Sequence, residues 1–199
     1  MTDDATLEIV RATPDRWSDV EELLGVSGEG GCWCQAWRGT DAKSISGGSS
    51  RPELLRDQMG GEPPAPGYIA YLGAVPVGWI GVSVRTETPR LMGSRTIPAI
   101  DDLPVWSIGC FQISPGYRRR GIAKALLNAV VWAAQAADAP GVEAYPIDPE
   151  GQRVEVGAGF VGTASMFDAV GFRRVLVTDG HSGRLPRLLV RLDLPKPSR

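Results

Sequence analysis

Histidine and cysteine are scarce in this chain of 199 residues, which has one histidine, His181, and three cysteines, Cys32, Cys34 and Cys110. A tetrahedral zinc site usually takes four such ligands, and no second Cys/His pair follows Cys32 and Cys34 at ligand spacing, so we expect no metal. The small, odd number of cysteines favours reduced thiols over a disulfide framework. His181 falls in a glycine-rich turn predicted between two closing strands, where a surface role is favoured over a catalytic one.

Long hydrophobic runs and a large net charge are also missing. No window approaches ~18 consecutive apolar residues, which argues against a membrane span. The opening residues, Met-Thr-Asp-Asp, are acidic and precede no apolar segment, so we expect no export and a cytoplasmic location. With a net charge of −2 and a pI near 5.5, the chain is not expected to bind nucleic acid or an anionic membrane.

The composition, 43% hydrophobic and 22% charged, is that of an ordinary globular protein, and the length predicts one domain over residues 1–199. Hydrophobic periodicity predicts an α/β fold with a mixed sheet. Gly109, inside the predicted central strand, indicates a bulge there. The predicted strands cover residues 6–12, 68–72, 75–84, 105–113, 142–147, 172–177 and 188–194, and the predicted helices begin near residues 14, 52, 121 and 163.

Three consecutive arginines, Arg118 to Arg120, lead into Gly121 and an alanine-rich helix predicted to reach Ala137. The N-terminus of a helix carries partial positive charge and unpaired amides, so it favours anions and disfavours arginine. A glycine there lets a bulky anion approach the backbone, and basic side chains strengthen its binding. The segment therefore predicts a phosphate site, although its spacing is neither Walker A nor Gly-x-Gly-x-x-Gly.

The sequence SPGYRRRGIAKALL, from Ser114 to Leu127, resembles motif A of the Gcn5-related N-acetyltransferases, the GNAT family. The Gly-Tyr-Ile-Ala-Tyr hairpin and the closing Met-Phe-Asp-Ala-Val-Gly-Phe segment extend the resemblance over most of the chain. It implies the GNAT acyl-CoA N-acyltransferase fold, whose mostly antiparallel central sheet splays at the cofactor site and is flanked by about four helices. It also implies transfer of an acetyl group from acetyl-CoA directly to a primary amine, without a metal.

The same resemblance assigns the acetyl-CoA site. Backbone groups of Phe111 and Ile113 would pair with the pantetheine arm, where a bulge near Gly109 and Cys110 opens the sheet. The loop and helix start would grip the pyrophosphate. By position, the residues that would hold it are Arg118, Arg119, Arg120, Gly121, Ile122, Ala123 and Lys124.

The family pattern fails at one position. Many members carry a tyrosine, four residues before the Gly-Phe pair, that protonates the departing CoA thiolate, and here that position is Phe167. Tyr145 and Ser165 are candidate replacements, as is bulk water, because a free thiol titrates near pH 8.5. Glu143 is the first candidate for the base that deprotonates the amine, although a structural role for it is equally open. Further carboxylate candidates are Asp101, Asp102 and Asp148.

The acceptor side is less informative. Trp33 and Trp37, in the unusual segment GCWCQAW, are predicted to line the acceptor cleft, with burial in the core as an even alternative. A small-molecule amine, an antibiotic, a peptide N-terminus and a protein lysine all stay open as acceptors, and we expect a monomer or a homodimer. A non-catalytic acyl-CoA-binding sensor or scaffold with the same fold is the alternative function.

Overall fold

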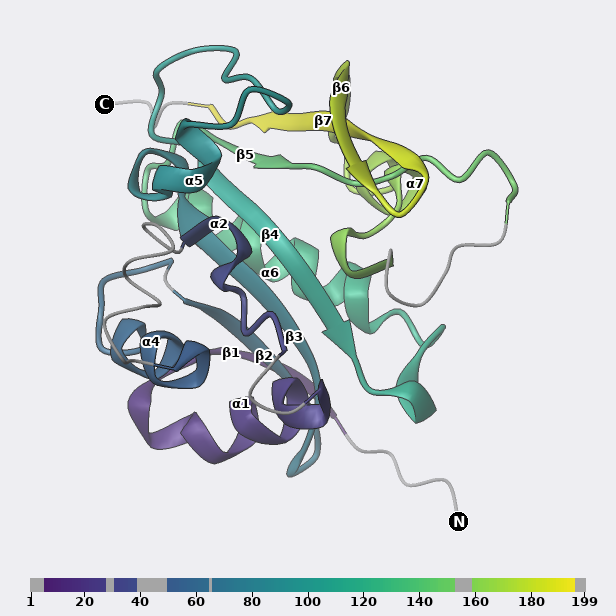
Figure 1. Ribbon diagram of the computed structural model, residues 1–199. Coiled ribbons are helices and arrows are strands. Elements are labelled where there is room, and N and C mark those ends of the chain that lie inside the picture. The colour runs from purple at the N-terminus through teal and green to yellow at the C-terminus, as the bar shows by residue number, and fades with distance from the viewer. Residues whose placement is uncertain (1–5, 28–30, 39–49, 65, 153–158, 196–199) are drawn as a thin grey trace.

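The computed structural model describes residues 6–27, 31–38, 50–64, 66–152 and 159–195. Its strands form one seven-stranded sheet in the order β1-β2-β3-β4-β5-β7-β6 (Figure 1). Neighbouring strands are antiparallel, except that β4 and β5 are parallel. The strands are β1 (Leu7–Arg11), β2 (Gly67–Leu72), β3 (Val75–Val84), β4 (Trp106–Ile113), β5 (Gly141–Ala144), β6 (Arg173–Ser182) and β7 (Leu185–Asp193).

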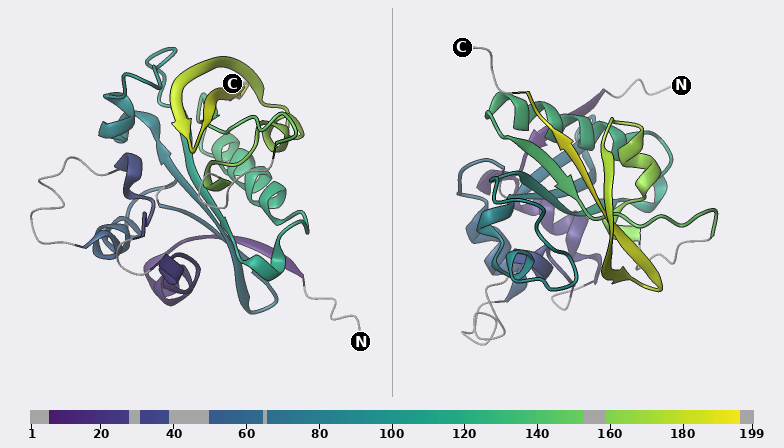
Figure 2. Two further views of the ribbon diagram at one scale, coloured as in Figure 1. Left: turned by 45° about the vertical axis from the view of Figure 1, so that its right-hand side comes forward. Right: turned by 90° about the horizontal axis from the view of Figure 1, so that it is seen from above.

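Helices cover both faces of the sheet (Figure 2). One face, here called the α6 face, packs against α6 (Ile122–Ala136) and α7 (Ala164–Asp168). The opposite face, the α2 face, carries α1 (Trp17–Leu24), α2 (Gln35–Arg38), α4 (Arg51–Gln58) and α5 (Pro89–Met92). The 3₁₀ turns are η1 (Pro14–Arg16), η2 (Gly25–Ser27), η3 (Arg85–Glu87), η4 (Pro115–Tyr117) and η5 (Gly159–Val161).

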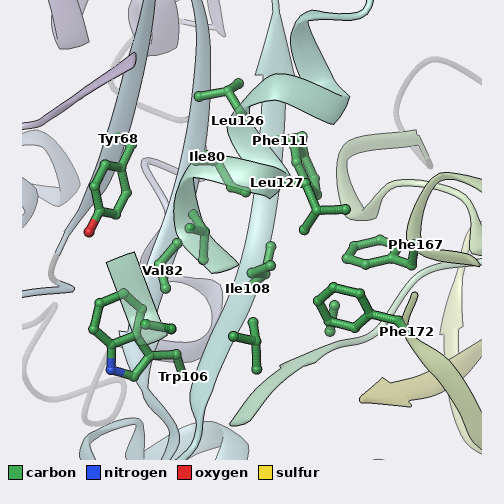
Figure 3. Close-up of a cluster of buried hydrophobic side chains, with 14 of the residues drawn as sticks. Tyr68, Ile80, Val82, Trp106, Ile108, Phe111, Leu126, Leu127, Phe167 and Phe172 are labelled. Atoms are coloured by element: carbon green, nitrogen blue, oxygen red, sulfur yellow. The ribbon is translucent and has the colours of Figure 1, made fainter. Parts of the chain in front are cut away.

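The α6 face holds the larger core cluster (Figure 3). In α6 the buried residues Ile122, Leu126, Val130 and Ala134 recur every four positions, so one side of the helix meets the sheet. Alternation along each strand then decides which residues they meet. In β3, for example, Ile80 and Val82 face α6, whereas Trp79 packs in the separate cluster under α1 and α4.

Most predicted elements are confirmed within a residue or two, because their start and stop signals are local. Helix α4 begins after Ser50, which forms a capping box with Glu53. The prediction that His181 lies in a turn is wrong: β6 runs to Ser182 and pairs His181 with Pro186, and the turn falls at Gly183, whose φ is 60°. His181 is exposed on that strand. No helix in the described parts of the chain is long and apolar enough to cross a membrane.

The sheet splays in its middle. Strand β4 pairs with β3 along its length, but it pairs with β5 only over Trp106, Ser107 and Ile108. Gly81 lies opposite Cys110 whereas the next residue of β3, Val82, lies opposite Ile108, so Gly109 is the extra residue of a bulge in β4. The predicted bulge and the mostly antiparallel, splayed sheet are therefore confirmed.

Candidate active site

The loop between β4 and α6 has the backbone of an anion cradle. Arg119 and Gly121 both adopt left-handed conformations, with φ of 61° and 79°. The first backbone hydrogen bond within α6 runs from Ala125 to the Gly121 carbonyl, at 3.0 Å, so the earlier amides have no acceptor inside the helix. A Cβ added at Gly121 would meet nothing within 4 Å. Open space and unpaired amides at the positive end of a 15-residue helix suit a bulky anion.

The side chains of this loop add exposed positive charge. Arg118, Arg119 and Arg120 are all exposed, and the first turn of α6 contains no acidic residue. The Arg118 Nε donates to the Ile113 carbonyl at 3.2 Å, and the Arg120 guanidinium stacks 5.4 Å from the ring centroid of Tyr117. These contacts hold two of the three cations beside the helix start without neutralising them.

The β4 edge that faces the splay presents the two residues predicted to meet pantetheine. The amide of Ser114, which follows β4, donates to Val77 of β3 at 3.0 Å. Because backbone groups alternate sides along a strand, Gln112 also faces β3, and Phe111 and Ile113 face the opposite edge. The contact of Arg118 with the Ile113 carbonyl fits this orientation. Beyond Ile108 that edge is not paired with β5.

Phe167 fills the position of the family tyrosine with an aromatic core contact. Its side chain is fully buried, 6.0 Å from the ring centroid of Phe111 and 5.2 Å from that of Phe172, both edge to face (Figure 3). A phenyl ring has no proton to donate. Ser165, two residues earlier on α7, is exposed, and its Oγ lies 3.2 Å from the Thr163 Oγ1.

Glu143 lies in a buried ion network on the α2 face. The carboxylate is fully buried, and its two oxygens accept from the Arg85 Nη1 at 2.9 Å and the Arg191 Nη1 at 3.0 Å. The Tyr145 hydroxyl donates to it at 3.1 Å, and Arg191 also reaches Asp101 at 2.7 Å. An enclosed carboxylate bound to two guanidiniums is poorly placed to take a proton from an acceptor. Glu143 and Asp101 thus belong to one ion network, in which Glu143 is enclosed and Asp101 is partly exposed.

Of the other candidates for proton transfer, Tyr145 belongs to the same buried network, whereas among the described residues no hydrogen bond or ion pair joins Asp102 or Asp148 to Glu143. Burial and the neighbouring Glu143 carboxylate raise the pKa of Tyr145, which makes this enclosed phenol a weaker acid than a free one. Asp102 is exposed. Asp148 pairs with Arg174 and lines a hollow of about 520 Å³ next to the β6–β7 hairpin, which shares no lining residue with the cavity described below.

A disulfide joins the residue that precedes α2 to the sheet. Cys34 forms a disulfide with Cys110 of β4, so the expectation of reduced thiols is wrong for this pair, whereas Cys32 is free and exposed. Sequence spacing gave no sign of the pairing, because 76 positions separate the two cysteines. Trp33 and Cys34 both have left-handed backbones, with φ of 45° and 56°. Such strain persists where the surroundings enforce it, as at many functional sites.

A cavity of about 20 Å³, large enough for roughly one water, lies at the Gly109 bulge. Trp37, Arg38 and Cys32 line it, together with Phe160 of η5. Of the two tryptophans predicted to line the acceptor cleft, Trp37 thus lines this cavity. Trp33 does not line it, because its side chain is buried in the core and stacked 6.0 Å from Trp17. In the described ranges no three His, Cys, Asp or Glu side chains are grouped to hold a metal ion.

Several solved structures with this fold are named as acetyltransferases. A histone acetyltransferase HPA2 and related acetyltransferase from Corynebacterium glutamicum matches with a TM-score of 0.58 and 14% identity, over 98% of this chain and 99% of that one. Ard1 from Thermoplasma volcanium matches with a TM-score of 0.55 and 13% identity, over 96% and 99%. A chain of the NatC complex bound to Gag peptide and CoA matches with a TM-score of 0.55 and 14% identity, over 95% and 99%.

The sequence model of the acetyltransferase (GNAT) family matches residues 34–149, more than half of the chain. The chain therefore belongs to the GNAT acetyltransferase family. No curated protein matches its sequence.

Proposed function

We propose that this protein is an N-acetyltransferase that moves an acetyl group from acetyl-CoA directly to a primary amine. One observation carries the proposal: the open edge of β4 leads within a few residues into the anion cradle at the start of α6. A single segment thus offers backbone partners for an amide-containing arm and then a phosphate site. Family membership supports the same function.

The cradle fits a pyrophosphate on physical grounds. The space at Gly121 admits a bulky group, and the amides that follow it lack partners within the helix. We assign the pyrophosphate to those amides and to the exposed Arg118, Arg119 and Arg120, with Lys124 exposed one turn further on. Backbone groups of Phe111 and Ile113 are assigned to the pantetheine arm. When bound, acetyl-CoA supplies the thioester that is broken in the reaction.

The residues of the chain mainly position acetyl-CoA and the amine, and the protons are exchanged with water. A neutral amine attacks the thioester carbonyl carbon, so a C–N bond forms and the C–S bond breaks. The sulfur keeps the electron pair, and the proton on nitrogen passes to water. A backbone amide on the open edge of β4, that of Phe111 or Ile113, polarises the carbonyl. Because a thiol titrates near pH 8.5, the thiolate needs no acid at the Phe167 position.

The pH dependence tests this account of proton transfer. Glu143 is the one buried carboxylate in the described part of the chain, and because two arginines hold it, this account gives it no role in removing the amine proton. We expect kcat/KM to rise tenfold per pH unit below the pKa of the amine, which is about 10.4 for a lysine-like amine. A plateau well below that pKa would instead identify a side-chain base.

The function itself is tested by binding and turnover. Saturating acetyl-CoA should raise the melting temperature, because a ligand at a hundredfold excess over its Kd stabilises the native state by about 2.7 kcal/mol. Release of CoA thiol with a panel of amines should then show transfer. Tight binding without turnover on any amine would support the acyl-CoA sensor, and no thermal shift at all would overturn the proposal.

A further inference from the structure

Four arginines lie on the α2 face, and two of them have no acidic partner among the described residues. Arg85 and Arg191 share the buried carboxylate of Glu143. Arg38 of α2 and Arg187 of β7 make no ion pair within the described ranges. A buried guanidinium without a counter-ion is costly, so these two positions call for an explanation.

Arg187 is held by aromatic rings. Only 8% of the residue is exposed, and its guanidinium carbon lies 5.4 Å from the ring centroid of Trp37 and 5.7 Å from that of Phe160. The rings attract the charge through their faces, but they accept nothing from N–H groups in the guanidinium plane. The Nε and Nη1 of Arg187 are buried without a hydrogen-bond partner. Burial lowers the pKa of Arg187.

Most of the guanidinium N–H groups of Arg38 donate hydrogen bonds to neutral acceptors. Its Nη2 donates to the carbonyls of Val82, at 2.7 Å, and of Pro66, and its Nε donates to the Ser83 Oγ. These bonds hold α2 against β3. The residue as a whole is partly exposed, but its Nη1 is buried and unpartnered. Burial lowers the pKa of Arg38 to about 10, and the Cys32 thiol partly opposes this.

Arg38 lines the cavity at the Gly109 bulge. Arg187 is not among the lining residues, but the two rings that hold it, those of Trp37 and Phe160, are. Cys32, exposed at its mouth, lies close enough to raise the pKa of each arginine. Two sets of spare donors thus flank the bulge where β4 and β5 part, which is the point toward which the proposed function directs the acetyl group.

We propose that the acceptor amine carries an oxyanion group, a carboxylate or a phosphate, which Arg187 and Arg38 bind beside the Gly109 bulge. The inference rests on the proposed function and narrows its acceptor to compounds such as amino acids. A planar guanidinium with free N–H groups matches an oxyanion in shape and charge. Because the cavity holds only about one water, the oxyanion approaches the two arginines from the mouth of the cavity, on the side of Cys32, and the rest of the acceptor lies outside.

Matched acceptor pairs test the inference. The probes are the common amino acids, each compared with its C-terminal amide, and phosphoethanolamine compared with ethanolamine, with CoA thiol release as the readout. In at least one pair we expect kcat/KM to be about tenfold or more higher for the oxyanion member, mainly through KM. The pair that shows the preference distinguishes a carboxylate from a phosphate.

Variants of Arg187 distinguish a role in acceptor specificity from a purely structural role. Arg187→Met should remove about tenfold or more of that preference, and Arg187→Lys should keep part of it, because lysine keeps the charge but not the planar fork. Arg184→Met, at an exposed position in the β6–β7 turn, is the control and should leave the preference unchanged. A merely structural role for Arg187 would lower the rates of both members of a pair equally.

The outcomes distinguish this inference from the proposed function. Equal turnover of acids and amides would overturn the inference and leave the acetyltransferase intact. If no amine is acetylated, the melting temperature is measured with CoA and the same acids or amides. A rise specific to the acids and lost in Arg187→Met would still support the oxyanion site, and no such rise would overturn it. Failure of acetyl-CoA to bind in the first place would overturn the proposed function.

Discussion

Arginine serves the two halves of this site in opposite ways. In the donor loop, Arg118 and its two neighbours are exposed, so water solvates each charge when no anion is present. On the α2 face, Arg85 and Arg191 are buried and depend on Glu143. Exposed cations thus tune ligand affinity at little cost to the fold, whereas buried cations make the fold depend on each partner.

The largest expected effect comes from breaking the buried network. Glu143→Ala leaves the buried guanidinium of Arg85 without a carboxylate and takes one of three carboxylates from Arg191, so it should destabilise the protein by roughly 3–5 kcal/mol. Urea unfolding followed by circular dichroism measures the loss. Arg173→Ala is the control, because its ion pair with Asp193 is more than half exposed and should contribute about 1 kcal/mol or less. Similar losses of stability in the two variants would contradict the claim that the fold depends more on buried cations than on exposed ones.

The disulfide is a second support of the buried half. Replacing Cys34 and Cys110 together by serine should cost roughly 2–4 kcal/mol, because the bond closes a long loop in the unfolded chain. Cys32→Ser, which changes a free and exposed thiol, should change stability by less than about 0.5 kcal/mol. The pairing itself is checked by alkylating the unfolded, unreduced protein. Three labelled thiols instead of one would show that the bond is absent.

The two halves also differ in how far sequence could predict them. The proposed donor half is contiguous from Phe111 to Lys124, so local strand, turn and helix signals are enough to predict it. The proposed acceptor half takes Arg38, Gly109, Phe160 and Arg187, which are far apart in the chain and meet only through strand order and the splay. No local pattern distinguishes such an arginine from a solvated one.

The same limit applies to the surroundings of single residues. Glu143 is a candidate base as a carboxylate on a strand after motif A, but sequence does not show that Arg85 of η3 and Arg191 of β7 both bind it. The Cys34–Cys110 bond likewise depends on α2 lying over the bulge. Long-range pairing of charges and sulfurs is a property of the folded sheet, and hydrophobic periodicity carries no information about it.

A change in the donor loop should affect ligand binding more than folding. Gly121→Val places a β-branched residue at a φ of 79°, so the loop must move and its amides lose their alignment. We expect acetyl-CoA affinity to fall about tenfold or more, which corresponds to at least ~1.4 kcal/mol. The control is Gly116→Val, in the same loop, where φ is not positive and a Cβ meets nothing within 4 Å. Equal affinities of the two variants for acetyl-CoA, measured by calorimetry, would argue against the cradle.

The smallest effect should come from one exposed cation. Arg119→Ala removes an exposed positive charge at the helix start. Because the Arg119 side chain donates no hydrogen bond within the described residues, acetyl-CoA affinity should fall only severalfold, by roughly 0.5–1 kcal/mol. Because the Debye length shrinks to about 3 Å at 1 M salt, the affinities of parent and variant should converge there. Urea unfolding without ligand should be nearly unchanged, in contrast to Glu143→Ala. A loss of acetyl-CoA affinity that does not depend on salt, or a large loss of stability, would mean that Arg119 supports the fold. It would contradict the idea that the exposed charges of the donor loop act on the ligand alone.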